Sequence, residues 1–225
     1  MKKVMIVAAA AMLFAAGTAQ AAVVAEWDTT GKTGSEVSIV GAGSAQVSAA
    51  DLVRGSGVTA SSAANNFGAI GWNGVNANDY IQFGMTVASG YQANLNELWI
   101  STRSSSTGPG TIGIYSSLDN YTNAIFTVAQ PSATYVNSKI DLSSLGAITG
   151  TVYFRVMEVG DTAPNGLATA GTGTFRVGDY NDGSAFLNIM LQGETSSSTP
   201  TPVPAAAWLL GSGLLGLVGL RRRQA

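Results

Sequence analysis

The side chains that most often carry catalysis and metal binding are missing, because the 225 residues include no Cys and no His. Without Cys there is no disulfide, no thiol nucleophile and no Cys-ligated zinc or iron–sulfur site. Without His there is no Ser-His-Asp triad and no imidazole ligand. Carboxylates remain for hydrolysis. The 13 Asp and Glu residues are scattered and form no recognisable acid–nucleophile pair, so we predict that the protein is not an enzyme.

The densest group of oxygen ligands is the sequence DYNDG at positions 179–183. It lacks the spacing of an EF-hand loop, because its glycine comes one position early and no Glu follows at the required distance. A hairpin turn is the alternative, since Asn-Asp-Gly is a turn sequence. Jelly-roll domains, the fold that the strand pattern described below predicts, often hold one structural calcium ion between chain ends. The candidate calcium ligands are therefore Glu26, Asp28, Asp179 and Asp182.

Aromatic side chains are the groups best suited to hold sugar, because the apolar face of a sugar matches an aromatic ring. Trp72 lies between Gly71 and Asn73-Gly74, which predicts an exposed position in a loop. Trp72, Tyr80 and Tyr91 are our candidate ligand contacts. Packing in a core is the alternative for all three.

The first 21 residues have the three parts of a secretory signal peptide. Two lysines follow Met1, an apolar run of 13 residues covers positions 4–16, and small residues end the segment. Ala19 and Ala21 supply the small side chains that signal peptidase needs, so we expect cleavage between Ala21 and Ala22. An N-terminal anchor is the alternative, but a membrane span needs ~20 apolar residues. We expect export through the general secretion machinery.

The C-terminal segment predicts a linker followed by a membrane helix. Residues 195–204 read TSSSTPTPVP, and their prolines oppose both helix and strand pairing. The uncharged residues 205–220 would form a helix of about 24 Å, somewhat shorter than a ~30 Å hydrocarbon core. The arginines that follow stay cytoplasmic by the positive-inside rule. We predict a single transmembrane helix with an Arg-rich tail at 205–225, so that the body faces outward. A C-terminal core helix is the alternative.

The segment PVPAAAWLLGSGLLGLVGLRRR at 202–223 resembles the PEP-CTERM sorting domain of exported proteins in Gram-negative bacteria. The residues that match are Pro202, Val203, Pro204, Ala205, Ala206, Trp208, Arg221, Arg222 and Arg223. The resemblance implies that an exosortase, a transpeptidase-like membrane enzyme, processes the tail at the inner membrane. Val203 stands where the motif has Glu, which leaves open which sorting enzyme acts. Retention as a permanent anchor is the alternative.

The body between these ends is acidic. Residues 22–200 hold six basic and all 13 acidic residues, and six minus 13 gives a formal charge of −7, compared with −2 for the whole chain. Such a charge disfavours nucleic acid and anionic lipid as partners. It is compatible with divalent cations and with neutral polysaccharide.

Strand patterns dominate this body. The clearest is Asp79–Val87, in which Ile81, Phe83 and Met85 fall on one face. Ser48–Val53 is the only helical candidate and is about one turn long. Arg155 and Arg176 lie inside strand patterns, where we expect ion pairs. The other predicted strands are Val23–Asp28, Glu36–Val40, Leu95–Thr102, Thr111–Ser116, Ala124–Val128, Tyr135–Leu142, Thr151–Val159, Thr174–Gly178 and Ala185–Leu191.

About ten short strands separated by turn clusters predict one all-β domain at 22–194, an antiparallel β-sandwich of jelly-roll type. The body also resembles, more loosely, the β-sandwich ectodomains of PEP-CTERM proteins, at Asn78–Phe83, Tyr153–Arg155 and Gly173–Val177. We expect an exported, non-catalytic protein of the cell surface or extracellular matrix with a structural role beside exopolysaccharide. A carbohydrate-binding module and a secreted hydrolase that uses carboxylates are the alternatives.

Overall fold

The computed structural model describes residues 22–198, and these residues are all-β. They form 17 strands and two short 3-10 helices, η1 (Ser117–Asp119) and η2 (Ser143–Leu145), with no α-helix among them. The predicted signal peptide and the tail from 199 onward lie outside the described residues. The described part of the chain holds no helix long and apolar enough to cross a bilayer. The all-β prediction is confirmed.

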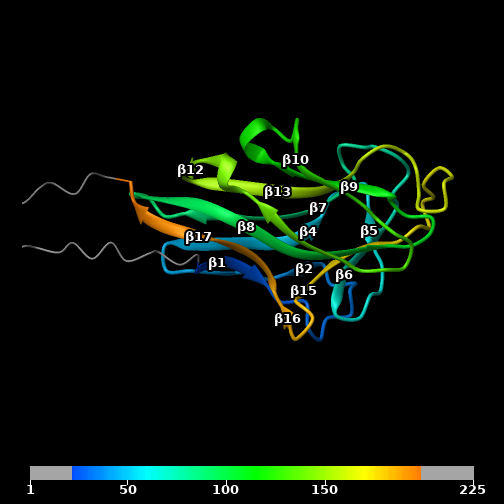
Figure 1. The fold of residues 1–225 in the computed structure, drawn as a ribbon, viewed down its shortest axis with the longest axis horizontal. Helices are drawn as coiled ribbons and strands as arrows, with labels where there is room; N and C mark the ends of the chain where they lie inside the picture. The colour runs from blue at the N-terminus through cyan, green and yellow to red at the C-terminus, as the bar shows by residue number, and fades with distance from the viewer. Residues whose placement is uncertain (1–21, 199–225) are drawn as a thin grey trace, which may run out of the picture.

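One layer is a six-stranded antiparallel sheet in the order β10–β9–β13–β7–β4–β2 (Figure 1). The predicted strand at Asp79–Val87 is β7, which begins one residue later, and its apolar face is buried as its alternation requires. The strands of this sheet are β2 (Ser38–Ile39), β4 (Val47–Arg54), β7 (Tyr80–Val87), β9 (Thr111–Ser116), β10 (Ala124–Ala129) and β13 (Thr151–Glu158).

The other layer is a nine-stranded antiparallel sheet in the order β3–β1–β17–β8–β14–β6–β5, with β11 and β12 also paired to β8. A separate hairpin joins β15 (Tyr180–Asn181) to β16 (Phe186–Leu187). The strands of the nine-stranded sheet are β1 (Ala22–Trp27), β3 (Ala42–Gly43), β5 (Thr59–Ala60), β6 (Asn66–Ile70), β8 (Tyr91–Ser104), β11 (Val136–Asp141), β12 (Ala147–Ile148), β14 (Phe175–Gly178) and β17 (Ile189–Ser197).

The two sheets enclose one hydrophobic core. The rings of Phe83 and Phe154, on neighbouring strands of the six-stranded sheet, stack with their centroids 5.8 Å apart. Trp27 reaches across from β1, and its ring centroid lies 5.0 Å from that of Phe83. Burying each such ring contributes about 1.5–3 kcal/mol, so these contacts hold the layers together.

Two sequence predictions are corrected by the strands. The predicted helical turn at Ser48–Val53 is wrong, because these residues lie in β4 and pair with β7. That pairing outweighs the weak local preference for helix. The domain also ends later than predicted, because β17 continues to Ser197, so the first three residues of the predicted linker at 195–204 belong to a strand.

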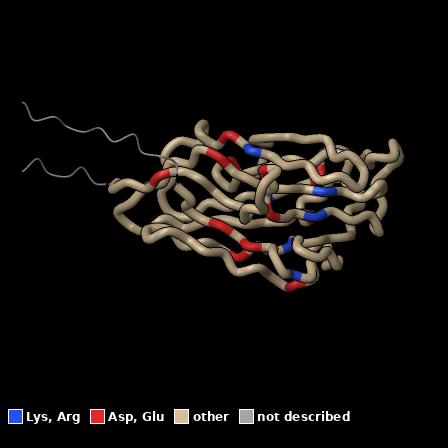
Figure 2. The backbone as a smooth tube through the Cα atoms, turned by 60° about the horizontal axis from the view of Figure 1, so that its bottom comes forward, with Lys and Arg blue, Asp and Glu red and all other residues tan. Residues whose placement is uncertain are grey.

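Charged residues are few, and Figure 2 marks their positions along the backbone. The side chain of Arg54 makes more hydrogen bonds than that of any other basic residue in the described part of the chain. Its guanidinium donates to the carbonyl oxygens of Gly68 at 2.7 Å and of Glu36 and Gly34 at 2.6 Å each. Its Cζ also lies 3.6 Å from the ring centroid of Phe67. Arg54 therefore fixes the loop before β2 against the two sheets.

The first and last strands lie side by side, with Ala22 of β1 opposite Gly193 of β17. Both ends of the described chain consequently leave from the same end of the domain (Figure 1). The loops that follow β1 and precede β17 lie at the other end of these two strands, and they help to form the site described next.

Candidate functional site

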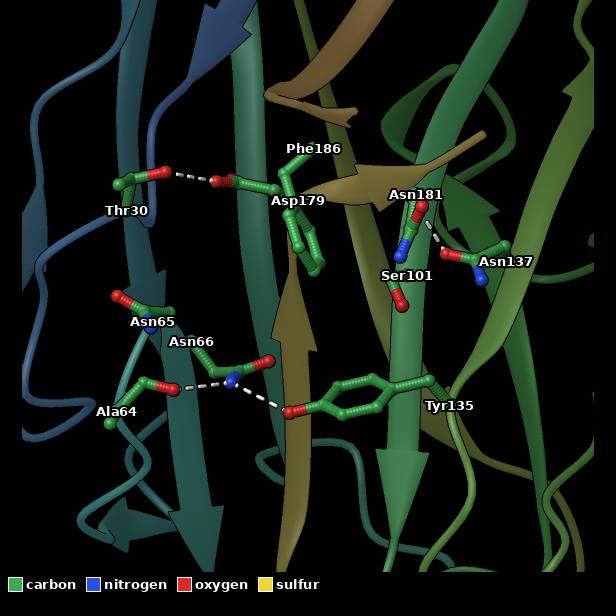
Figure 3. Close-up of a pocket in the computed structure, with 10 residues that line it drawn as sticks. All are labelled: Thr30, Ala64, Asn65, Asn66, Ser101, Tyr135, Asn137, Asp179, Asn181 and Phe186. Atoms are coloured by element: carbon green, nitrogen blue, oxygen red, sulfur yellow. Dashed lines mark hydrogen bonds between the residues drawn. The ribbon is translucent and has the colours of Figure 1, made fainter. Parts of the chain in front are cut away.

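A cleft of about 270 Å³ opens beside the β15–β16 hairpin, at the far end of β1 (Figure 3). Five separate segments of the chain line it, so only the folded sheet brings them together. Strands β8 and β11 form its floor, and the hairpin and the loops after β1 and before β6 form its walls. The lining residues are Thr30, Ala64, Asn65, Asn66, Ser101, Tyr135, Asn137, Asp179, Asn181 and Phe186.

Two aromatic rings are available at the cleft. Phe186 lies on β16 and is 73% exposed, and Tyr135, just before β11, is 42% exposed. A phenyl ring this accessible is unusual for a soluble domain, which normally buries Phe. The hydroxyl of Tyr135 accepts a hydrogen bond from Nδ2 of Asn66 at 2.9 Å, which fixes the position of the ring.

Four asparagines supply the polar part of the cleft. Asn65 accepts a hydrogen bond from the backbone N–H of Gly31 at 2.8 Å through its side-chain oxygen. Asn137 accepts one from the backbone N–H of Asn181 at 2.9 Å in the same way. Each therefore holds a fixed orientation, and the described residues provide no acceptor for the amide nitrogens of Asn65 and Asn137. These groups are free to donate to a ligand.

Asp179 is the one carboxylate among the described residues that line the cleft. Its Oδ1 accepts from the backbone N–H of Thr29 at 2.9 Å and lies 2.7 Å from the Thr29 hydroxyl. Its Oδ2 accepts from the Thr30 hydroxyl at 2.9 Å. The side chain is 7% exposed, so these bonds satisfy a buried charge and hold the loop after β1 in place.

The other candidate calcium ligands have different partners. Glu26 accepts from the side chain of Asn188 at 3.1 Å, and Asp28 accepts from the backbone N–H of Thr30 at 2.8 Å. Asp182 accepts from the backbone of the hairpin turn, and these hydrogen bonds lower its pKa. Within residues 22–198, no three carboxylates form a group that could hold a metal ion.

The predicted exposure of Trp72 is wrong. Its side chain is fully buried, its Nε1 donates to the carbonyl oxygen of Ala69 at 3.2 Å, and its ring packs edge-on against Phe175 at 5.4 Å. Tyr80 is half-buried on the outer face of the six-stranded sheet, and Tyr91 is 39% exposed at the start of β8. The three aromatic candidates do not meet, and none lines the cleft.

Of the residues that line the cleft, Asp179 was the one candidate that the sequence indicated, and Tyr135, Phe186 and the asparagines were not predicted as site residues. Both aromatic residues stood inside predicted strands, where a half-buried packing role is the ordinary expectation. The predicted sorting residues at 202–223, and Ala19 and Ala21 of the predicted cleavage site, lie outside the described residues. Ala22 is the first residue of β1.

Comparisons of the chain with family models, with curated proteins and with solved structures found no match.

Proposed function

We propose that this chain is an exported, non-catalytic protein of the cell surface or extracellular matrix that holds neutral exopolysaccharide in the cleft. The observation that carries this proposal is the combination of two accessible rings with four asparagines, each oriented by a hydrogen bond, in one cleft. Sugars present an apolar face that stacks on such rings. Their hydroxyls both donate and accept, as the side-chain amide does.

The single carboxylate among the residues that line the cleft supports binding of a glycan without its hydrolysis. Glycoside hydrolysis uses a pair of carboxylates on either side of the scissile bond. The lining residues include Asp179 alone, and its two oxygens already accept hydrogen bonds from Thr29 and Thr30.

Export and sorting complete the proposal. Signal peptidase removes residues 1–21, the helix at 205–220 anchors the chain in the inner membrane, and an exosortase acts on the PEP-CTERM-type tail. The two targeting segments attach at the same end of a sandwich of jelly-roll type. Thr30 follows β1 and Phe186 precedes β17, so the cleft lies at the other end of these strands and stays accessible while the chain is anchored.

Isothermal titration of the full chain with dextran, a soluble β-1,3-glucan and galactomannan tests this proposal. We expect one of these neutral polymers to bind, and Phe186→Ala to weaken that binding about tenfold, because the ring loses its stacking contact. Leu167→Ala is the matched control, since Leu167 is 68% exposed but lies outside the cleft. Binding that Phe186→Ala leaves unchanged would place the glycan elsewhere, and failure of all three polymers would count against the proposal.

A further inference from the structure

Three adjacent strands of the six-stranded sheet, β7, β13 and β9, present an outer face without acidic side chains. Successive residues of a strand point to opposite faces, so every second residue of β7, β9 and β13 points away from the core, although Gly84 and Gly113 on this outer face are themselves covered. None of these outward residues is acidic, although the body carries a formal charge of −7. The outward residues are Tyr80, Gln82, Gly84, Thr86, Thr111, Gly113, Tyr115, Thr151, Tyr153, Arg155 and Met157.

Two tyrosine rings on this face lie against the sheet, over glycines. A β-carbon placed on Gly84 would come 2.7 Å from Cδ1 of Tyr153. A β-carbon placed on Gly113 would come 2.7 Å from Cε2 of Tyr115. The rings occupy the space that a side chain at each glycine would need. The two rings therefore lie flat along the sheet and expose aromatic surface on its outer face.

Arg155 stands beside these rings, opposite Tyr115 in the strand register. Its Cζ lies 3.8 Å from the ring centroid of Tyr80 and 3.9 Å from that of Tyr121, so the guanidinium is held between two aromatic faces. Its Nε donates to Oε1 of Gln82 at 2.9 Å. The expected ion pair is absent, since no described residue offers Arg155 a carboxylate partner. The two terminal nitrogens are left for an external acceptor.

We propose that this face binds a carboxylate-bearing polysaccharide, such as a polyuronate, at a second site separate from the cleft. Arg155 forms paired hydrogen bonds to the sugar carboxylate, for which the planar guanidinium is well matched. Tyr115 and Tyr153 stack on the apolar faces of the sugar rings. Salt screens exposed charges that lie more than about 8 Å apart, and none of the outward residues of β7, β9 and β13 is acidic.

The chemistry of the face favours an acidic glycan over a neutral one. A neutral chain would cover the guanidinium without supplying a charged acceptor, and that desolvation is costly. The inference extends the proposed function with a second ligand class, and it holds whether or not the cleft binds neutral glycan. With both sites occupied, one molecule connects two different polysaccharide chains.

Affinity electrophoresis and titration of the full chain with polygalacturonate, and with its fully methyl-esterified form, test the proposal. We expect binding to the acid polymer and about tenfold weaker binding to the ester, which has the same backbone without the charge. Arg155→Gln should weaken binding to the acid polymer about tenfold, and Arg155→Lys should fall between the two, because a lysine keeps the charge without the paired geometry.

Lys139→Gln is the matched control, since Lys139 also lies over a ring, that of Trp99 at 3.6 Å, but on the other sheet. It should bind as the wild type does, and thermal unfolding should show that each variant is folded. Phe186→Ala should keep its affinity for polygalacturonate even where the cleft binds no glycan, which separates this site from the proposed function. Equal binding of acid and ester, an unaffected Arg155→Gln variant, or no binding of polygalacturonate would overturn the proposal.

Discussion

At the scale of single residues, two arginines show how surroundings decide the role of one side-chain type. The guanidinium of Arg54 donates hydrogen bonds to three backbone carbonyls within the fold. Burial lowers the pKa of Arg54 to about 10, which still leaves the side chain charged at neutral pH. Arg155 has one hydrogen bond within the described residues and two free nitrogens. The first residue is structural, and the second is available to a ligand.

Replacing Arg54 with Met should destabilise the domain by about 3 kcal/mol, because three backbone carbonyls lose charge-assisted hydrogen bonds. Denaturant unfolding measures this as a lower midpoint with an unchanged slope. Lys139→Met is the control, since Lys139 is exposed, and it should cost less than about 1 kcal/mol. Similar midpoints for the two variants would show that the Arg54 contacts contribute little.

Glu158 should make the domain less stable as the pH rises. Its carboxylate oxygens are buried and have no hydrogen-bond partner among residues 22–198. Burial, with Asp161 and Asp79 nearby, raises the pKa of Glu158 from 4.5 to about 7. The folded state therefore prefers the protonated acid. The stabilisation is complete below about pH 4.5 and is lost as the pH rises through 7.

The expected loss for Glu158 is about 2 kcal/mol between pH 5 and 8, which allows for partial screening by solvent. Thermal unfolding of the wild type and of Glu158→Gln across this range measures it. The stability of the variant should decrease less as the pH rises. Part of the decrease that remains comes from Asp79, because burial also raises the pKa of Asp79. Parallel curves for the two proteins would contradict a buried, protonated Glu158.

At the scale of elements, the β15–β16 hairpin positions the exposed ring of the cleft. Asp182 accepts hydrogen bonds from the backbone N–H groups of Ser184 and Ala185 at 2.8 Å each, which closes the turn before Phe186. Asp182→Ala should therefore weaken binding of neutral polysaccharide about threefold to tenfold, since the ring must be ordered on binding. Titration and thermal unfolding together measure the effect.

Asp141→Ala is the matched control for the hairpin variant. Asp141 is also exposed and caps a turn through the backbone N–H of Ser143 at 2.8 Å, but it does not line the cleft. Its removal should leave glycan affinity unchanged. An equal loss of affinity in both variants would mean that the hairpin has no special role.

The strands that the sequence predicts well are those with strict alternation, such as β7, because one face is buried and the other is not. β6 escaped prediction because its sequence, NFGAI, is buried at almost every position and shows no alternation. Trp72 was assigned correctly to a loop, but its burial depends on Phe175, about 100 residues later in the chain. The cleft joins positions from 30 to 186, and no local spacing connects them.

At the scale of the whole molecule, we propose that the domain binds polysaccharide and that the two predicted targeting segments direct its export and sorting. The two ends of the described chain lie together at one end of the sandwich. The cleft lies at the other end of β1 and β17. This arrangement suits a molecule that connects polysaccharide chains at a surface.

Mass spectrometry of protein released from the cell surface tests the processing of the tail. Trypsin cuts after Arg176 and next after Arg221, so the intact chain gives a peptide from Val177 to Arg221. We expect the released protein to begin at Ala22 and to lack this peptide, with a shorter fragment that ends near the linker. An intact peptide ending at Arg221 in the released protein would show that the tail is retained.

The most direct test of the account is an NMR titration of the mature protein with the neutral polysaccharide that it binds, reading the side-chain amide signals of the asparagines. We expect the signals of Asn65, Asn66, Asn137 and Asn181 to shift together and to saturate with one affinity, while the signal of Asn123, outside the cleft, stays in place. Shifts confined to residues outside the cleft, or none at all, would contradict it.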